Sequence, residues 1–445
     1  MIHAPQLRIA WFSPLPPVRS GIAAYSADIL PALAADHAIA PFAESNAHDF
    51  VWQARRNPFD LVVYQLGNAP CHDYMWAYLA RYPGLVVLHD ARLHHARART
   101  LLDQKRFEDY RHEFRYDHPD AARDFAEYAV EGLGGPIYYF WPMLRVVMQT
   151  ARAVAVHNPR VADDLRAAYP GVSVDTIRMG VPRLEAGTAA HRASLRRDLD
   201  LPDEAIVFAA FGKVTSEKRI GPILDALSAL VAAGRNAYLL IVGDADGHPA
   251  LHGEAVRQHV ADRVRMTGFV PDARIGAHLD AADVALCLRW PTAEETSASW
   301  LRCLAAARPT VISDLAHLVE IPTVDPREWR TRSPKEPVAV AIDLMDEGPS
   351  LLAAMRALAD DRALRERLAR CGHEYWATHH TVDAMAEDYR RVLPAAAGRP
   401  APRAADLPSH FTDDHTGLTR RIADEFGVNL RLGLPGDGDP GVRGG

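Results

Sequence analysis

Two lysines stand at a turn that could bind phosphate. Lys213 and Lys218 follow the apolar run AIVFAAFG, where a predicted strand gives way to the next helix. Fixed ammonium groups at such a turn suit a diphosphate, because they stabilise the negative charge that grows on a leaving phosphate. Solvated surface lysines are the alternative interpretation of the same pattern.

The stretch PTAEETSASWLRCLAAARPTVISD, residues 291–314, predicts a loop, a helix and a strand. At the helix entrance, free backbone N–H groups and the positive end of the helix dipole favour an anion. Three hydroxyl side chains and one small residue stand there: Thr296, Ser297, Ser299 and Ala298. Glu294 and Glu295 precede them, and a carboxylate in this place can either cap the helix or accept hydrogen bonds from a bound sugar.

Polar side chains also follow the predicted strands of the first half. Asn68 follows LVVYQLG, and His89 and Asp90 end GLVVLHD. If these strands are parallel, the three side chains share one sheet edge, where His89 and Asp90 could hold a sugar hydroxyl or accept a proton. A structural histidine is the alternative. Gly21 begins a helix after a proline-stiffened loop and could let a ligand oxygen approach the backbone, although a simple tight turn is favoured.

Neither a metal ion nor a dinucleotide is expected. Asp244 and Asp246 have the Asp-x-Asp spacing of some cation sites, but glycines bound their loop and we favour a turn. His94 and His95 follow His89 in HDARLHH, at a spacing that matches no standard ligand set. The glycines also lack the G-x-G-x-x-G fingerprint, so the sequence does not support NAD binding.

The elements that must position these residues alternate along the chain. Short apolar runs such as RIAWFS, LVVYQLGN, AIVFAAFG and YLLIVGD are each followed by a helical pattern. They exceed the eight strands of a barrel, and a polar link, VPRLEAGTAAHRAS, falls midway. We therefore predict an α/β fold of two doubly wound, Rossmann-like domains facing a cleft. The predicted bounds are 1–185 with a helical insertion at about 97–150, then 195–375, and a mostly flexible tail at 397–445.

Composition is ordinary for a soluble protein. Of 445 residues, 48% are hydrophobic and 24% charged, and the net charge of −7 comes with scattered Lys and Arg, so nucleic acid is not an expected partner. The four cysteines form no CxxC pair and are interpreted as reduced thiols of a cytosolic protein. Because neither a signal peptide nor a membrane span is recognisable, the expected location is cytoplasmic.

Five motifs together carry a family resemblance. KVTSEKRI, LLIVGD, VRMTGFVPD, AADVALCLRWPT and EETSASWLRCLAAARPTVISD occur in this order. They resemble the nucleotide-sugar domain of GT-B-fold retaining glycosyltransferases of the family 4 group, and in architecture the resemblance covers residues 6–395. It implies that the first domain lies on the acceptor side and that residues 376–396 form a helix that crosses back to it.

The resemblance also implies roles for named residues. Catalysis would rest on His89, Lys213, Lys218 and Glu294, with the two lysines on the donor diphosphate. Donor binding would use Gly21, Gly268, Phe269, Glu295, Thr296, Ser297, Ala298 and Arg302, of which Gly268 and Phe269 meet the nucleotide base. Asn68 and Asp90 would face the acceptor.

The implied reaction is hexosyl transfer from a nucleotide diphosphate sugar to an acceptor hydroxyl with retention. The acceptor would attack on the face of the leaving group, so that neither an enzymic nucleophile nor a cofactor or metal ion is required. A glycan or a lipid-linked acceptor of cell-surface polysaccharide or glycolipid synthesis is expected. Peripheral contact with the inner face of the membrane is left open, since no basic amphipathic segment requires it.

Arg302 departs from the family pattern. The family carries a second glutamate eight positions after the first, on the helix, where it clasps the ribose. Counted from Glu294 this position is Arg302, and a guanidinium has only donors, so it cannot replace that contact in kind. Arg302 could pair with Glu294 or Glu295, contact donor phosphate, or point to solvent. Two rival functions follow: a catalytically silent nucleotide-sugar-binding protein, and a nucleotide-sugar epimerase or hydrolase.

Overall fold

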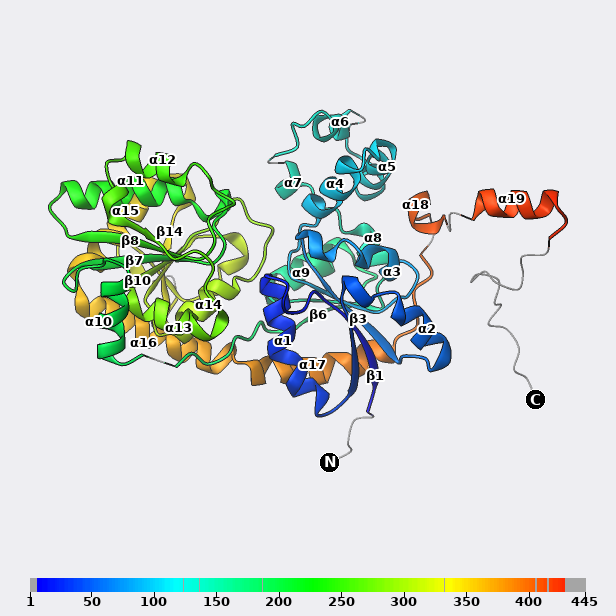
Figure 1. The fold of residues 1–445 in the computed structure, drawn as a ribbon, viewed down its shortest axis with the longest axis horizontal. Helices are drawn as coiled ribbons and strands as arrows, with labels where there is room; N and C mark the ends of the chain where they lie inside the picture. Colours follow the sequence, from blue (N-terminus) through cyan, green and yellow to red (C-terminus); the bar gives the residue numbers. More distant parts are fainter. Residues whose placement is uncertain are drawn as a thin grey trace.

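The computed structural model describes residues 6–428 except 123, 136, 186, 332, 405, 414 and 415. Within these ranges the chain forms two sheets, built almost wholly of parallel strands and covered by helices, that lie side by side (Figure 1). The predicted doubly wound fold is confirmed, and the barrel is excluded.

The first sheet has the strand order β2-β1-β3-β4-β5-β6, with every pair parallel. Its strands are β1 (Arg8–Phe12), β2 (Ala38–Phe42), β3 (Leu61–Leu66), β4 (Leu85–Leu88), β5 (Ala153–Val156) and β6 (Val174–Thr176). The strand order reverses between β1 and β3, and open α/β sheets bind ligands at the carboxyl ends of strands beside such a reversal. The loops that carry Gly21 and Asn68 leave the sheet there.

The second sheet has the order β13-β12-β14-β11-β10-β7-β8-β9, in which only the β12–β13 pair is antiparallel among the residues described. Its strands are β7 (Ile206–Phe211), β8 (Ala237–Val242), β9 (Val264–Met266), β10 (Val284–Cys287), β11 (Thr310–Ser313), β12 (Thr323–Asp325), β13 (Arg330–Thr331) and β14 (Ala339–Ile342). Its order reverses between β7 and β10. The turn with the two lysines and the loop with the two glutamates start from these two strands.

Helices cover both faces of each sheet, which is why strands such as β3 and β8 are buried along their whole length and almost wholly apolar, with Gln65 of β3 as the exception. The first half contains α1 (Gly21–Ala34), α2 (Asp49–Arg56), α3 (Met75–Leu79), α4 (His94–Asp103), α5 (Phe107–Asp117), α6 (Phe125–Val130), α7 (Ile137–Phe140), α8 (Arg145–Thr150) and α9 (Pro159–Ala168). The second half contains α10 (Ala189–Asp198), α11 (Ile220–Ala232), α12 (Leu251–Arg257), α13 (Asp272–Ala281), α14 (Ala298–Ala305) and α15 (Glu347–Asp360).

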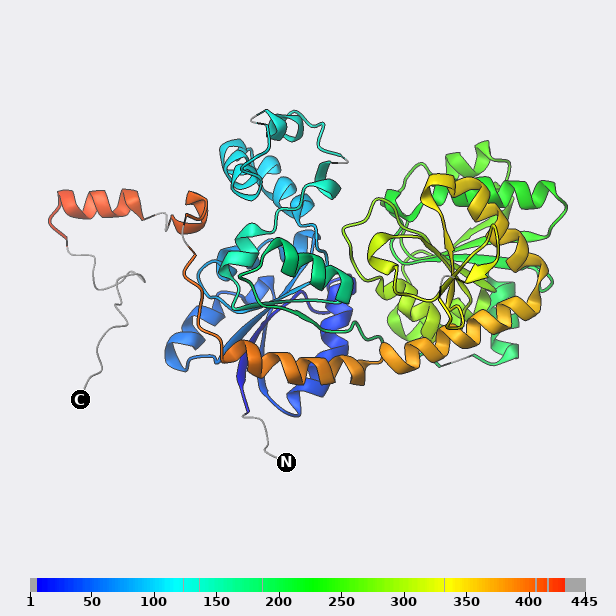
Figure 2. The same cartoon turned by 180° about the vertical axis from the view of Figure 1, so that it is seen from behind.

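The chain then returns to the first domain, as predicted. Helix α16 (Arg362–His379) lies along the second domain, and α17 (Val382–Ala397) packs against α1 and β3 of the first (Figure 2). Thr381 caps the start of α17 by accepting from the Ala384 N–H. The Arg178 guanidinium pairs with Asp388 at 2.7 Å and holds the helix in place.

Helices α4 to α8 lie between β4 and β5 and carry a small core of their own around Tyr110 and Phe114. In the predicted tail, α18 (Ser409–Thr412) packs on this side of the first domain. Its His410 Nε2 lies 2.6 Å from Glu113, and its Phe411 ring lies 6.3 Å from Trp76. Helix α19 (Gly417–Glu425) follows, and residues 429–445 of the predicted tail lie outside the described residues.

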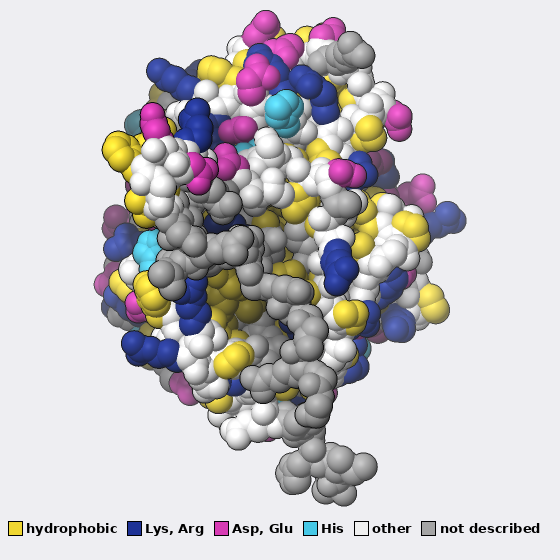
Figure 3. All heavy atoms as spheres, turned by 90° about the vertical axis from the view of Figure 1, so that its right-hand side faces the viewer, with side chains coloured by type: hydrophobic (Ala, Val, Ile, Leu, Met, Phe, Trp, Pro, Cys, Tyr) yellow, Lys and Arg dark blue, Asp and Glu magenta, His cyan; other side chains and the backbone are white. Residues whose placement is uncertain are grey.

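On the face drawn in Figure 3, basic and acidic side chains are interspersed and neither sign forms a continuous stripe. Of the helices that the structure describes, none combines the length and the apolar character needed to cross a membrane.

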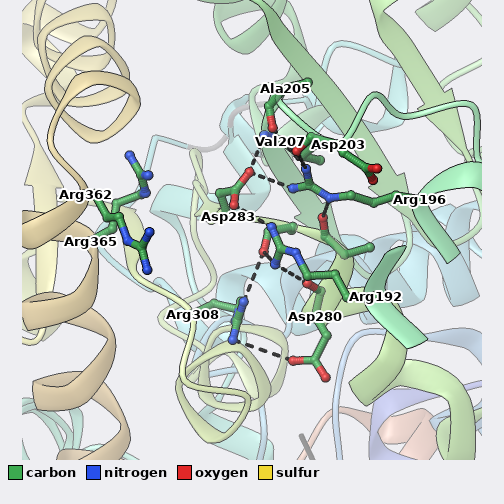
Figure 4. Close-up of polar contacts among 12 residues, drawn as sticks. Arg192, Arg196, Asp203, Ala205, Val207, Asp280, Asp283, Arg308, Arg362 and Arg365 are labelled. Carbon is green, nitrogen blue, oxygen red and sulfur yellow. Dashed lines mark hydrogen bonds and ion pairs between the residues drawn. The ribbon is translucent and has the colours of Figure 1, made fainter. Parts of the chain in front are cut away.

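A buried ion cluster ties α10 to the second sheet (Figure 4). The Asp283 carboxylate accepts from Arg192 at 2.6 Å and from Arg196 at 2.8 Å, and it also accepts from the backbone N–H of Val207 in β7. Arg196 is only 3% exposed, so its charge depends on Asp283 for compensation. Removing one member of a buried pair leaves the other charge unpaired and desolvated.

We therefore expect Asp283→Asn to lower the free energy of unfolding by about 3–5 kcal/mol, the range for a broken buried ion pair. Urea denaturation followed by circular dichroism measures this. Glu366→Gln, which removes an exposed pair with Arg362, is the matched control and should leave the midpoint almost unchanged. Equal midpoints for the two variants would contradict a structural role for the cluster.

Candidate functional site between the two domains

Two adjoining cavities open between the domains. The larger, of about 600 Å³, lies between the loop that precedes α1 and the ends of β7 and β8. The smaller, of about 320 Å³, lies between the start of α9 and the ends of β10 and β11. Phe211 and Ser299 line both cavities, which therefore meet at these two residues.

Lys213 and Lys218 lie on the two sides of this junction. Lys213 lines the larger cavity and Lys218 the smaller one. The Lys218 Nζ donates to the carbonyl oxygen of Phe211 at 2.7 Å. Burial, followed by the positive charge of Arg289, lowers the pKa of Lys218 to about 8. An ammonium group in so desolvated a position is stabilised by an anion beside it.

Gly212 makes this close packing possible. Its φ of +96° lies in a region that residues with a Cβ rarely adopt. A Cβ at this position would also lie 2.8 Å from Ser299 Oγ and 3.3 Å from Lys218 Nζ. The end of β7 thus brings the backbone, the Ser299 hydroxyl and the Lys218 ammonium group together.

Helix α14 begins between the two cavities. Ser297 caps it by accepting from the Trp300 N–H at 3.2 Å. Thr296 and Ser297 line the smaller cavity, and Ala298 lines the larger one. The predicted helix entrance therefore stands beside the lysines, where its N–H groups and dipole add to their positive field.

Both glutamates ahead of the helix are held by arginines. Glu295 pairs with Arg289 at 2.6 Å, and its second oxygen accepts from the Ala293 N–H at 2.9 Å. Glu294 has a positive φ of 61° and pairs with Arg92 of the first domain at 2.6 Å. Neither acid caps α14, because Ser297 does so. Glu295 lines the smaller cavity, whereas Glu294 is not among the residues that line either cavity.

Arg302 is 8% exposed, so it does not point to solvent. Its Nη1 donates to Asp272 at 3.1 Å, and its Nη2 lies 3.8 Å from Asp28 on α1. All three side chains line the larger cavity. Burial raises the pKa of Asp28, and the charge of Arg302 opposes that rise. Pairing with Glu294 or Glu295, one of the expected alternatives, is not what the structure has.

The first domain contributes several of the predicted residues. Gly21 lines the larger cavity at the start of α1. Asn68 and Asp90 organise the adjoining loops, since the Asp90 carboxylate accepts from the Asn68 N–H at 2.7 Å. Burial, followed by the negative charge of Glu295, raises the pKa of Asp90 to about 7. Asp90 therefore lies close to the loop that carries Glu295.

His89 lies behind the wall of the site. It is 6% exposed, and its two ring nitrogens lie 2.8 Å from Gln65 Oε1 and 3.2 Å from His157 Nε2. His157 itself lines the smaller cavity. Burial, followed by the neighbouring His157, lowers the pKa of His89 well below its ordinary value. His89 is therefore neutral, with protein partners on both nitrogens.

The predicted base-binding segment borders the larger cavity. Phe269 is 49% exposed, lines this cavity and carries the Arg19 guanidinium 4.2 Å from its ring centre. Gly268 precedes it with a φ of +66°, which glycine adopts readily. The aromatic face and its cation come from different domains.

Direct contacts join the domains around both cavities. The Ala91 N–H donates to the Ala293 carbonyl at 2.8 Å, next to the pair of Arg92 and Glu294. In the helical insertion, the Tyr139 hydroxyl donates to Glu217, which immediately precedes Lys218. The loops that hold the lysines and the glutamates are therefore in contact with the first domain.

Asp244, Asp246 and His94, which were considered as metal ligands, make hydrogen bonds within the protein. The Asp246 N–H donates to the Asp244 carboxylate at 2.7 Å, which is the turn that we favoured. His94 lies 2.7 Å from the Tyr110 hydroxyl inside the insertion. Among the described residues, His, Cys, Asp and Glu form no group of three that could hold a metal ion.

Sequence reasoning missed Asp28, Asp272, Arg289 and His157. His157 ends the apolar run AVAVHN, which is the same strand-end signal that identified His89. Pairing of Arg302 with an acid was one of the expected alternatives, but the partners come from α1 and α13, far from it in the chain. Nothing local in the sequence distinguishes those two aspartates.

The second domain is similar in sequence to known proteins. Residues 205–343 match the family model described as "Glycosyl transferases group 1". The alpha-D-kanosaminyltransferase of Streptomyces kanamyceticus is 28% identical over 264 residues, 56% of this chain and 62% of that protein. The lipopolysaccharide core biosynthesis glycosyltransferase LpsD of Rhizobium meliloti is 27% identical over 194 residues, 44% and 51% of the two chains. The match thus spans only about half to three fifths of these relatives.

Solved structures match over more of the chain. Anabaena Alr3699/HepE, in complex with UDP and glucose, has a TM-score of 0.60 at 14% identity and covers 88% of this chain and 100% of its own. WaaG, a glycosyltransferase involved in lipopolysaccharide biosynthesis, has a TM-score of 0.56 at 13% identity, over 86% and 99%. At such identities the likeness concerns the fold. The chain therefore has the GT-B fold, and its residues 205–343 are similar to the glycosyl transferases of group 1.

Proposed function

We propose that this protein transfers a hexose from a nucleoside diphosphate sugar to an acceptor hydroxyl group, with retention of configuration. One observation carries the proposal: two cavities meet at Ser299, with Lys213 on one side, Lys218 on the other and the start of α14 between them. That junction suits a diphosphate, and each cavity then takes one of the two groups that the diphosphate joins.

The nucleoside half belongs in the larger cavity. Phe269 offers an aromatic face there, and Arg19 covers it from the first domain. The backbone at Gly243 is also exposed to this cavity, which suits hydrogen bonds to a base or a ribose. The solved structure of the GT-B protein HepE with UDP and glucose supports this class of ligand.

The sugar half belongs in the smaller cavity. Glu295, Ser297 and Asn158 line it and offer both acceptors and donors to sugar hydroxyls. Asn158 also donates to the His317 carbonyl of the second domain at 2.8 Å, so both domains enclose this space. Enclosure excludes water, and a donor sugar then meets an acceptor in preference to hydrolysis.

In the reaction, the bond between the anomeric carbon and the phosphate oxygen breaks and a bond to the acceptor oxygen forms on the same face. The acceptor proton passes to the departing phosphate. Lys213, Lys218 and the start of α14 stabilise the phosphate charge, so the proposal requires no metal ion or other cofactor. Glu294 and Glu295 are both paired with arginines, which supports attack by the acceptor itself over attack by a carboxylate.

The acceptor class follows from the relatives. Their names include lipopolysaccharide core glycosyltransferases and a GDP-mannose-dependent phosphatidylinositol dimannoside mannosyltransferase of Mycobacterium tuberculosis, which is 31% identical over 152 residues. We propose a glycan or lipid-linked hydroxyl as acceptor, with peripheral membrane contact where the acceptor is lipid-linked.

Arg302 favours a second candidate, a protein that binds the nucleotide sugar without turnover. Where the family has a ribose-clasping glutamate, this chain has a cation paired with Asp272 and Asp28. In a transferase, Asp272 would supply the carboxylate that the helix lacks, because it lines the same cavity and is 66% exposed.

The direct test measures nucleoside diphosphate release from UDP-, GDP-, ADP- and dTDP-glucose and from GDP-mannose, with and without octyl glycosides and a bacterial lipid extract as acceptors. We expect one base to be used, release to depend on acceptor, and an α-linked product by NMR from the α-configured donor. Lys218→Ala should abolish release, whereas the exposed Lys105→Ala should not. Binding without release would select the silent protein, and release without acceptor would select a hydrolase.

Binding of the matching nucleoside diphosphate should weaken as pH rises through about 8. The ligand raises the pKa of Lys218, so it binds the ammonium form that the free protein loses above that pH. Isothermal titration between pH 7 and pH 9.5 should show affinity falling by up to about tenfold per unit above pH 8. A flat profile would mean that Lys218 does not contact the diphosphate.

Arg302→Ala should weaken nucleoside diphosphate binding by about two- to fivefold, the effect of a partly exposed charge interaction. The physical reason is that the Asp28 and Asp272 carboxylates then face the anion without compensation. Adding Asp272→Asn should restore part of the affinity, and isothermal titration of the single and double variants compares them. No loss in the single variant would show that Arg302 plays no part in the charge balance of the cavity.

A further inference from the structure

A chain of buried polar side chains joins helix α17 to His89. The hydroxyl groups of Tyr25 and Tyr389 lie 2.8 Å apart, and Tyr389 lies 3.0 Å from Gln65 Nε2. Gln65 Oε1 lies 2.8 Å from His89 Nε2, and His89 Nδ1 lies 3.2 Å from His157 Nε2. All five side chains are at most 6% exposed, so each donor and acceptor must find its partner within the protein.

The direction of each hydrogen bond in this row of five side chains can be assigned, starting at His157. His157 Nδ1 lies 2.8 Å from the backbone carbonyl oxygen of Ile177, which only accepts, so His157 carries its proton on Nδ1. Burial lowers the pKa of His157 to about 4, which keeps the ring neutral and leaves a lone pair on Nε2. His89 must therefore donate to it from Nδ1.

The same assignment continues through Gln65. A neutral His89 with its proton on Nδ1 has a lone pair on Nε2, and that nitrogen must accept a hydrogen bond. The partner is the Gln65 amide, whose nitrogen and oxygen exchange places on a half-turn. With the amide turned, its NH₂ group donates to His89 and its oxygen accepts from the Tyr389 hydroxyl. With the amide unturned, His89 would have to carry its proton on Nε2 to donate to the Gln65 oxygen. The lone pair on His89 Nδ1 would then face the lone pair on His157 Nε2, unless one of the two histidines were a buried cation.

We propose that Tyr389, on the helix that returns from the second domain, is a positioning residue for His89. Its hydroxyl donates to Gln65, the turned amide donates to His89 Nε2, and His89 is held as the Nδ1–H tautomer. Every hydrogen bond then runs in one direction, from Tyr25 through Tyr389, Gln65 and His89 to His157 and the Ile177 carbonyl.

This arrangement changes the role that His89 can have. Both ring nitrogens are engaged within the protein, so His89 acts through a fixed ring position and not as a proton donor or acceptor for the acceptor sugar. The residues that follow it reach the second domain, because the Ala91 N–H donates to the Ala293 carbonyl in the loop with the two glutamates. The packing of α17 on the first domain is thereby linked to the position of the loop that carries Glu294 and Glu295. This functional part rests on the proposed transferase activity, whereas the tautomer of His89 does not.

The test uses the full chain labelled with ¹⁵N-histidine, and two-bond ¹H–¹⁵N spectra distinguish Nδ1–H from Nε2–H. His89→Gln identifies the His89 signals. In the wild type we expect a protonated Nδ1 and a bare Nε2. In Tyr389→Phe the Gln65 oxygen loses its donor, but His157 still requires the Nδ1–H tautomer of His89. We therefore expect the tautomer to stay and the His89 Nε2 signal to shift, because the amide that donates to it is no longer fixed by Tyr389.

Tyr25→Phe is the matched control, because it removes a buried tyrosine hydroxyl from the same chain yet leaves the Tyr389–Gln65 hydrogen bond in place. It should leave both the tautomer and the His89 Nε2 signal as they are in the wild type. An Nε2–H or cationic His89 in the wild type, or an unchanged His89 Nε2 signal in a folded Tyr389→Phe protein, would overturn the proposal. If transfer occurs, Tyr389→Phe should lower kcat about tenfold or less while the KM for the donor stays unchanged. Absence of transfer in the wild type would count against the proposed function alone.

Discussion

The arrangement of the candidate site depends on a positive charge that is buried away from water at the junction of the two cavities. Lys218 is buried, and burial together with Arg289 lowers its pKa to about 8. Such a group costs free energy in the unliganded protein, since desolvation disfavours the ammonium form. An anion at the same place offsets this cost, and the Lys218 ammonium is already oriented by the Phe211 carbonyl. In the proposed reaction, this is where the leaving phosphate develops its charge.

The acids near this junction serve mainly to hold the surrounding arginines. Glu295 holds Arg289, Glu294 holds Arg92 across the domain boundary, and Asp272 holds Arg302. These pairs confine the negative charges, so that the lysines face an anion with little competition. At position 302, α14 carries a cation instead of a carboxylate, and its partner Asp272 on α13 supplies a carboxylate at the wall of the same cavity.

The two domains are connected by contacts of different kinds. Around the cavities, ion pairs and single hydrogen bonds join the loops that carry Arg92, Glu294 and Tyr139. Water can readily replace either partner in such contacts. On the other side, α17 is buried against the first domain through residues such as Met385 and Tyr389. The contact through α17 is therefore buried, and the buried polar chain connects Tyr389 of this helix to His89.

Local sequence was sufficient to predict the elements and the edge of each sheet at which the candidate site lies. Apolar runs of strand length followed by helical patterns predict two doubly wound domains, because strands buried on both faces must be apolar. Parallel strands collect their carboxyl ends at one edge, and so the positions of Lys213, Lys218, Ser297 and Gly21 after predicted strands were enough to assign them to the cleft.

Tertiary structure alone decided which charges meet. Arg302 pairs with Asp28 and Asp272, and His89 reaches Tyr389 through Gln65, although these residues are far apart in the chain. Ion pairs and hydrogen bonds depend on distances of a few ångströms and on which side chains are desolvated. Periodicity specifies neither quantity, because it fixes the face of an element and not the neighbour that covers that face. The sequence therefore predicted which residues would line the cleft between the domains, and the packing of two domains and one returning helix determined the electrostatics of that cleft.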